Sequence, residues 1–355
     1  MDWVRAKTNF GQLAADPAIG NLRTLTLRHK GRDLTPLHSA PWLDTHDLPS
    51  DLAPVERDLS GDFFCAPFGT SDVEPAPPHG WSANSPWQVA HTHESRIDLV
   101  LERQILGADI SKTLQLSVDA PILYQTHVLT GGSGALSIAH HPMIRVVSRG
   151  VFSTSPKRAI LTPEVPLEYG RNALANSQRS TDLTRVPAAG GGTADLTHLP
   201  IANGTEDFVT LVEAEHPGIG WSAVVRDTED DIVFCLKDPR VLPITMLWHS
   251  NGGRDYPPWS GRHRGVIGIE DGCAAGAAGH RAALTPNPVS REGVPTALPL
   301  GGTHRIAHAI GAIARPEGWT RITSISRDGT ALILADESGA TLHLPFDPDF
   351  FTETT

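Results

Sequence analysis

Glu270 lies where a carboxylate could move a proton. In the stretch 261–272, Ile267 and Ile269 alternate with Gly268 and Glu270, as in a short β-strand whose successive side chains point to opposite faces. The isoleucines would face a core, and the glycine beside the carboxylate would let a ligand approach the backbone. A carboxylate held in this way can act as a general base, although buried acids are also often structural partners of arginines.

A second group of suitable residues lies between Pro77 and Trp87. It contains His79, Trp81, Asn84 and Trp87. Indole faces can cover the C–H side of a pyranose, while imidazole and amide groups can hydrogen-bond to its hydroxyls. The stretch therefore predicts sugar contacts, with the alternative that the tryptophans simply cover the core.

His140 and His141 form a third candidate. Pro142 follows directly and restrains His141 to extended backbone geometry. Neighbouring side chains of an extended segment point to opposite faces, so at most one of the two histidines can serve a given site.

The segment 248–259 is the fourth candidate. It contains Trp248, Arg254 and Trp259 within a loop that precedes the Glu270 strand. These side chains can stack on, or hydrogen-bond to, a polyhydroxylated ligand.

In order and in type, these stretches resemble the aldose 1-epimerase (galactose mutarotase-like) superfamily. The resemblance is carried by His79-Gly80 with Trp87 downstream, by His141-Pro142-Met143-Ile144 and by Gly268-Ile269-Glu270. It implies a large antiparallel β-supersandwich over nearly the whole chain. It also implies that Glu270 removes the proton of an anomeric hydroxyl, that His141 protonates the ring oxygen, and that His79 orients the sugar. This chemistry needs no metal and no cofactor.

The sequence also departs from that family. An Asn-Arg pair is usual upstream of the His-Gly segment, but residues 61–69 contain no arginine, and Met143-Ile144 stands where the family has two aromatic residues. These departures leave open which sugar is bound, whether it is phosphorylated, and whether catalysis is retained.

Composition narrows the class of protein. The 355 residues are 19% charged and 39% apolar, which is typical of a folded chain. A formal net charge of −11, without any run of Lys and Arg, argues against nucleic-acid binding. Three scattered cysteines predict neither disulfides nor a zinc site. Neither a signal peptide nor a membrane span is indicated, so we expect a cytoplasmic protein. We also expect it to be a monomer or a homodimer.

Strand signals recur along the chain and predict one all-β domain, a sandwich over residues 1–355. Residues 40–60 are expected to be a surface excursion, while 153–205 and 272–300 are expected to be mainly loops. Strands are predicted at 22–29, 34–38, 97–103, 110–118, 122–130, 135–141, 207–213, 220–226, 231–236, 242–249, 319–326, 330–335 and 340–345.

Two alternatives remain open. His91-Thr92-His93 places two imidazoles on one face of a strand, as in the metal motif of cupins, with Glu94 or Asp98 as a further ligand. A non-catalytic carbohydrate-binding or sugar-sensing protein on the same scaffold would keep the tryptophans and not need Glu270.

Overall fold

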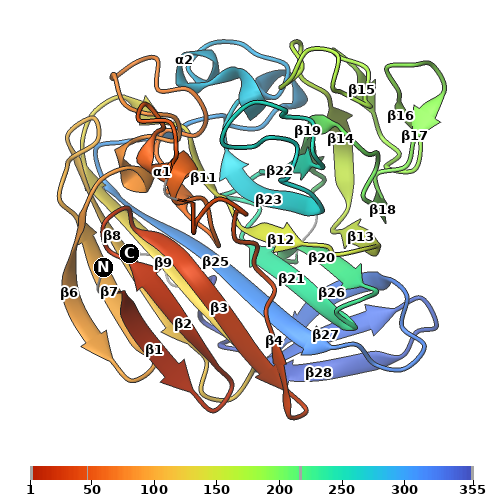
Figure 1. Ribbon diagram of the computed structural model, residues 1–355. Coiled ribbons are helices and arrows are strands. Elements are labelled where there is room, and N and C mark those ends of the chain that lie inside the picture. The colour runs from red at the N-terminus through yellow and green to blue at the C-terminus, as the bar shows by residue number, and fades with distance from the viewer. Residues whose placement is uncertain (1–2, 46, 216–217, 353–355) are drawn as a thin grey trace.

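The computed structural model describes residues 3–45, 47–215 and 218–352, and most of its regular structure is antiparallel β-sheet (Figure 1). The larger of two main sheets has nine strands. Their order is β18 (His198–Leu199), β13 (Gly150–Thr154), β20 (Gly220–Arg226), β21 (Asp231–Lys237), β25 (Thr303–Ala314), β9 (Ile122–Gly131), β8 (Ala108–Leu116), β7 (Arg96–Leu101) and β6 (Trp87–His93).

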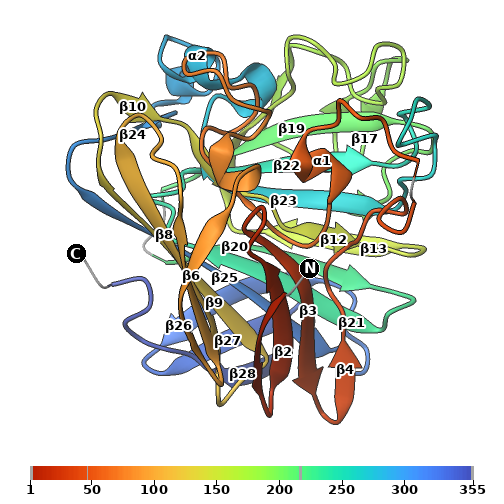
Figure 2. The ribbon, with the colours of Figure 1, turned by 60° about the vertical axis from the view of Figure 1, so that its left-hand side comes forward.

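The second main sheet has eight strands and carries Glu270. Its order is β15 (Arg179–Ser180), β14 (Lys157–Leu161), β19 (Glu206–Glu213), β22 (Ile244–Ser250), β23 (Val266–Cys273), β11 (Ile138–His140) and β5 (Phe64–Cys65), with β12 (Met143–Arg145) also paired to β23. In Figures 1 and 2, β22 and β23 lie above β20 and β21 of the larger sheet.

Smaller elements surround the two sheets. The strands are β1 (Val4–Thr8), β2 (Gly11–Asp16), β3 (Asn21–His29) and β4 (Arg32–Leu34) in one sheet, β26 (Ile322–Asp328), β27 (Ala331–Asp336) and β28 (Thr341–Pro345) in another, and the pairs β10 (Ala135–Leu136) with β24 (Leu298–Pro299) and β16 (Val186–Pro187) with β17 (Thr193–Ala194). The helices are α1 (Pro54–Arg57), η1 (Trp81–Ala83), η2 (Gly276–Ala278), α2 (His280–Ala283) and η3 (Ser290–Glu292). None of the helices in the described part of the chain is long and apolar enough to cross a membrane.

Alternating side chains give the eight-stranded sheet two different faces. On β23, Ile267 and Ile269 join the core between the sheets, whereas Val266 belongs to a cluster on the opposite face. On β19, Val209 and Phe208 divide in the same way. The eight-stranded sheet therefore has an inner apolar face, and an outer face on which side chains can form a pocket.

Most of the predicted strands are present, within a few residues of their expected bounds, and the all-β class is confirmed. The sequence did not predict β1, β2, β6 or the 12-residue β25. The expectation of a surface excursion at 40–60 was wrong in part, since Trp42, Val55 and Leu59 are buried in the outer cluster.

Candidate active site

A pocket of about 240 Å³ lies over the outer face of the eight-stranded sheet. Apolar and aromatic side chains form most of its wall, which is the usual composition of a small-molecule site. The apolar lining comprises Val55, Leu59, Phe63, Phe68, Pro78, Leu167, Phe208, Trp248, Trp259 and Ala277. The polar side chains that line it are Glu56, Thr70, His79, His141, Arg254 and Glu270.

Glu270 and His141 are in direct contact in this pocket. Oε1 of Glu270 lies 3.1 Å from Nε2 of His141, although the two residues are far apart in the sequence. Both side chains are almost fully buried, and neither Oε2 of Glu270 nor Nδ1 of His141 has a hydrogen-bond partner. The pair therefore keeps unused hydrogen-bonding capacity on both members, in a pocket that a ligand could enter.

Gly268 makes room for the side chain of Glu270, and its predicted role in admitting a ligand stays a prediction. A Cβ at position 268 would lie 2.7 Å from Oε1 of Glu270 and 3.2 Å from Cβ of Trp248. Any side chain there would displace the carboxyl group or the indole. The close approach that Gly268 permits is that of Glu270 itself.

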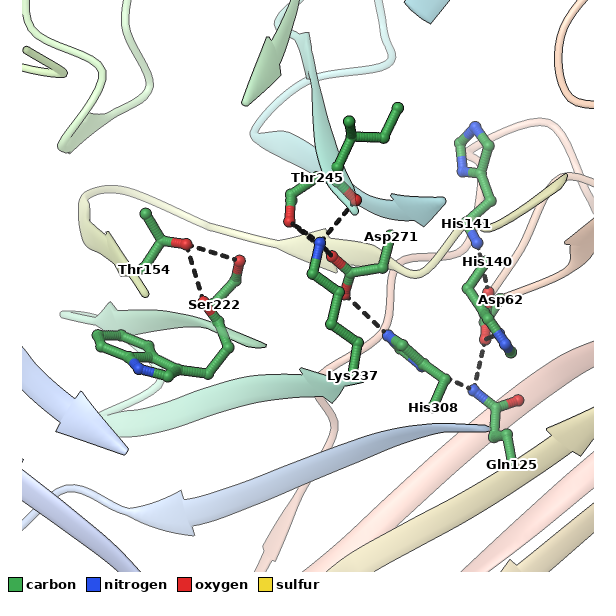
Figure 3. Close-up of polar contacts among 12 residues, drawn as sticks. Asp62, Gln125, His140, His141, Thr154, Ser222, Lys237, Thr245, Asp271 and His308 are labelled. Atoms are coloured by element: carbon green, nitrogen blue, oxygen red, sulfur yellow. Dashed lines mark hydrogen bonds and ion pairs between the residues drawn. The ribbon is translucent and has the colours of Figure 1, made fainter. Parts of the chain in front are cut away.

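His141 is held at its backbone and at its ring. Its N–H donates to Oδ1 of Asp62 at 2.8 Å, while its imidazole points away from Asp62 (Figure 3). The ring stacks on Phe63, with centroids 4.4 Å apart. His140 points the opposite way and stacks on His308 between the sheets, so only His141 lines the pocket, as the alternation predicted.

Burial controls the protonation of the Glu270–His141 pair. It raises the pKa of Glu270 well above its usual value and lowers the pKa of His141 to about 4. Both shifts favour the uncharged arrangement, in which the carboxyl group carries the proton and donates it to Nε2. Because the two groups are in contact, the apparent pKa values at which they gain or lose protons are properties of the pair.

The second pocket imidazole, that of His79, lies in a tightly held turn. Its own φ is 66° and that of Gly80 is 74°, and a Cβ on Gly80 would lie 1.9 Å from the carbonyl oxygen of Ala66. Nδ2 of Asn84 donates to the carbonyl oxygens of Pro78 and Gly80, at 2.8 and 2.7 Å. The ring of His79 meets that of His141 edge to face, with centroids 5.2 Å apart.

Asn84, Trp81 and Trp87, which the sequence predicts to contact a ligand, pack and hydrogen-bond within the protein. None of the three lines the pocket. Both ends of the Asn84 side chain are used within the protein, since Oδ1 also accepts from the N–H of Val55. Trp87 is buried with its Nε1 donating to Ser82, while Trp81 packs against Arg103 at 4.3 Å. These side chains instead support the His79 turn and the core.

Trp248, Trp259 and Arg254 line the pocket, and their contact with a ligand stays a prediction. The guanidinium carbon of Arg254 lies 4.4 Å from the ring centroid of Trp259 and 5.6 Å from that of Trp248. Its Nε donates to Oε1 of Glu168 at 2.9 Å. The cation is thus fixed above two indole faces, with its Nη groups left as candidates for contacts to a ligand.

Several residues that shape the site carried no recognisable signal. Glu206 on β19 accepts a hydrogen bond from Nε1 of Trp248 at 2.9 Å and so orients that indole. Phe68 and Phe208 form wall segments from distant parts of the chain. The only indication of Asp62 in the sequence is its position in the stretch 61–69, which is bounded by glycines and contains no arginine.

A buried polar network lies beneath the pocket, between the two main sheets (Figure 3). Its members are Asp62, Gln125, Lys237, Asp271 and His308. Lys237 contacts Asp271 at 2.9 Å, Asp271 contacts His308 at 3.1 Å, and Gln125 donates to Asp62 at 2.6 Å. Burial would raise the pKa of Asp62, but its contacts with His140, His308 and Gln125 hold it at about 2.

Two groups of histidines contain potential metal ligands. Potential ligand atoms of Asp62, His140 and His308 lie within 4.8 Å of one another. However, the two rings stack with an interplanar angle of 16°, so their in-plane lone pairs cannot converge on one ion. His91 and His93, the cupin-like alternative, lie exposed on edge strand β6 and are not in a potential metal cluster within the described ranges.

The chain has the galactose mutarotase-like fold. The galactose mutarotase related enzyme from Lactobacillus acidophilus superimposes with a TM-score of 0.56 at 11% identity, covering 89% of this chain and 99% of that one. A galactose mutarotase-like protein from Lactobacillus casei gives 0.54 at 11%, covering 88% and 100%. The Slr1438 protein from Synechocystis sp. PCC 6803 gives 0.58 at 12%, covering 88% and 96%.

The similarity lies in the fold and not in the sequence. No protein-family model matches the chain, and no curated protein matches it either. At 11–12% identity, these structures establish the architecture alone, since a shared fold does not fix the chemistry of a site.

Proposed function

We propose that the protein is an aldose 1-epimerase-like isomerase, which interconverts the α and β anomers of a monosaccharide or sugar derivative. The observation that carries the proposal is the buried contact between Glu270 and His141, 3.1 Å long, inside an aromatic pocket. Anomerisation acts on two oxygens bonded to the same carbon, so its acid and base must be close neighbours. A carboxyl and an imidazole in contact meet that requirement.

In the proposed mechanism, Glu270 takes the proton of the anomeric hydroxyl while His141 gives a proton to the ring oxygen. The bond between the anomeric carbon and the ring oxygen breaks, and an open-chain aldehyde forms. Rotation about the bond next to the aldehyde, followed by the reverse proton transfers, closes the ring as the other anomer. Protons balance over the cycle, and each positioned group contributes on the order of 100- to 10,000-fold.

The resting pair holds its proton on the carboxyl side, so it must rearrange before Glu270 can act as a base. Sugar hydroxyls entering the pocket replace some of the missing solvation and favour the charged form of both groups. The proton then moves from Glu270 to His141 along the existing contact. This transfer requires no exchange with solvent.

The shared proton predicts an unusual pH profile. An ordinary histidine becomes protonated between pH 7 and pH 5. Because burial lowers the pKa of His141 to about 4, its imidazole stays neutral over that interval. We expect kcat/KM to stay level over that interval, to fall only near pH 4, and to fall at high pH as Glu270 loses the shared proton. Stopped-flow polarimetry from pH 3.5 to 10 would measure this, and an inflection near pH 6.5 would contradict it.

Arg254 is proposed to hold the sugar against Trp248 and Trp259, in place of the arginine that the upstream segment lacks. We expect Arg254→Met to raise KM about 10- to 100-fold with little change in kcat, because it removes charged hydrogen bonds made equally in ground and transition states. Steady-state kinetics would test this. Arg240→Met is the control, since Arg240 pairs with Asp238 outside the pocket. A loss confined to kcat would place Arg254 in the chemical step instead.

NMR magnetisation exchange between anomers, measured over a panel of aldoses, tests the function directly. Faster exchange for at least one aldose is expected. The matching methyl glycosides cannot open their rings, and should bind competitively without exchange. If several sugars bind and none exchanges faster than in buffer, the protein is a carbohydrate-binding module and the isomerase proposal is wrong.

A further inference from the structure

Cys65 contacts the pocket imidazole that the acid–base pair does not include. Its Sγ lies 3.3 Å from Nδ1 of His79. Cys65 is fully buried on β5, where it pairs with Ala139 of β11, only two residues before His141. The thiol therefore approaches His79 from the sheet side, while the imidazole lines the pocket.

The backbone of His79 gives this contact a fixed geometry. The N–H of His79 donates to the carbonyl oxygen of Gly69 at 2.8 Å, and its own carbonyl accepts from the N–H of Ala66 at 3.3 Å. Phe63 and Phe68 meet the ring edge to face, with centroids 5.5 and 5.4 Å away. With backbone and ring both held, Nδ1 is committed to Cys65, and Nε2 is the nitrogen left for a ligand.

The chemistry of the two groups decides which of them donates. Burial lowers the pKa of His79 well below its usual value and raises the pKa of the Cys65 thiol well above its own, so both are uncharged. A thiol is a weak acceptor, whereas a bare imidazole nitrogen accepts well. The hydrogen bond at one ring nitrogen then fixes the tautomer of the whole ring.

We propose that Cys65 is a positioning residue whose thiol donates to Nδ1 of His79 and so holds the imidazole as the Nε2–H tautomer. His79 then presents a donor to the pocket and cannot act as a base there. The ligand atom that it meets must be an acceptor, such as a hydroxyl or ring oxygen. That last step relies on the proposed function, whereas the tautomer itself does not.

Long-range ¹H–¹⁵N NMR of histidine-labelled protein measures the tautomer in the absence of any sugar. The His79 signals are assigned by their loss in His79→Gln. In the wild type we expect a protonated Nε2 and a bare Nδ1, and a protonated Nδ1 would overturn the inference whatever the activity. This measurement needs no substituted Cys65, so it decides the question even if Cys65→Ala fails to fold.

Activity provides the second test. Cys65→Ser keeps a donor and should retain the wild-type tautomer and kcat/KM within about threefold. Cys65→Ala removes the donor and should mix the tautomers and lower kcat/KM about 3- to 10-fold, the value of one neutral hydrogen bond. Cys273→Ala, a buried cysteine outside the pocket, should change neither quantity. Equal loss in the serine and alanine variants, with the tautomer unchanged, would make Cys65 a packing residue only.

If no aldose is anomerised, the proposed function fails while the tautomer result stands. If anomerisation is found but His79 carries its proton on Nδ1, the function stands and the role of Cys65 fails. The two outcomes are therefore distinguishable.

Discussion

Replacing Glu270 with glutamine should abolish most of the anomerisation while leaving sugar binding intact. The amide can still donate to Nε2 of His141, as the protonated carboxyl does, so the pocket keeps its shape. It cannot accept the proton of the anomeric hydroxyl. We expect kcat to fall by about 100- to 10,000-fold with KM changed less than threefold, because the lost interaction exists only during proton transfer. Magnetisation exchange and a binding titration on the same sugar would measure both.

Glu56→Gln is the matched control for this substitution. Glu56, on α1, supplies the other carboxylate of the pocket wall, whereas the carboxylate in contact with His141 is that of Glu270. If Glu56→Gln abolished exchange and Glu270→Gln did not, the base would have been assigned to the wrong carboxylate.

The same glutamine should make the protein more stable at neutral pH. A carboxyl whose folded pKa is raised contributes stability below its unfolded pKa of about 4.5, and this is lost as pH rises toward the folded value. Glutamine does not titrate, so the free energy of unfolding of Glu270→Gln should exceed that of the wild type at pH 7. The gain should disappear near pH 4, and urea unfolding at the two pH values would reveal it. Equal stability at both pH values would contradict the raised pKa.

Local alternation was enough to orient the catalytic candidates. Ile267 and Ile269 could be buried only on one face, and this fixed the direction of Glu270 on the other. Pro142 fixed the extended geometry of His141 in the same way. The alternation of side chains along a strand can be read from one segment of sequence, without knowing which strands pair with it.

Alternation did not predict strand β25, because it is built largely from small residues. β25 lies in the middle of the nine-stranded sheet, but much of it is alanine, glycine and histidine, which have weak strand preferences. Its β21 neighbour packs a phenyl ring against Gly311, where a Cβ would lie 2.0 Å from Cζ of Phe234. The partner strand β21, which is distant in the sequence, explains why residue 311 is glycine. A local sequence pattern contains no information about that partner.

The tryptophans show why residue type alone did not separate ligand contacts from structure. Trp81, Trp87, Trp248 and Trp259 all had the character of sugar platforms. The structure places the first two in the packing around the His79 turn and the last two in the pocket. The same indole surface can pack in a core or cover a sugar. Which of the two occurs depends on where the fold places the tryptophan. The arginine expected upstream is absent, and Arg254 occupies the pocket from another loop.

The buried network beneath the pocket predicts a large loss of stability in Lys237→Met. Nζ of Lys237 donates to the carbonyl oxygen of Ile244 and to Oγ1 of Thr245, and lies 3.0 Å from Glu213 and 2.9 Å from Asp271. Methionine fills a similar volume but removes the ammonium group that Asp271 contacts, whereas Glu213 keeps its contact with Lys157. Removing one partner of a buried ion pair typically costs about 3–5 kcal/mol, and we expect a loss in that range.

Urea unfolding at pH 7 would measure the loss, with Lys7→Met on exposed strand β1 as the control, expected within about 0.5 kcal/mol of the wild type. Adding Asp271→Asn to Lys237→Met removes the uncompensated carboxylate, so the double variant should recover part of the stability. If Lys237→Met alone matched the control, the lysine would not be compensating buried charge. If the loss in the double variant equalled the sum of the losses in the two single variants, Asp271 would be kept ionised by His308 and Thr245 and not by Lys237.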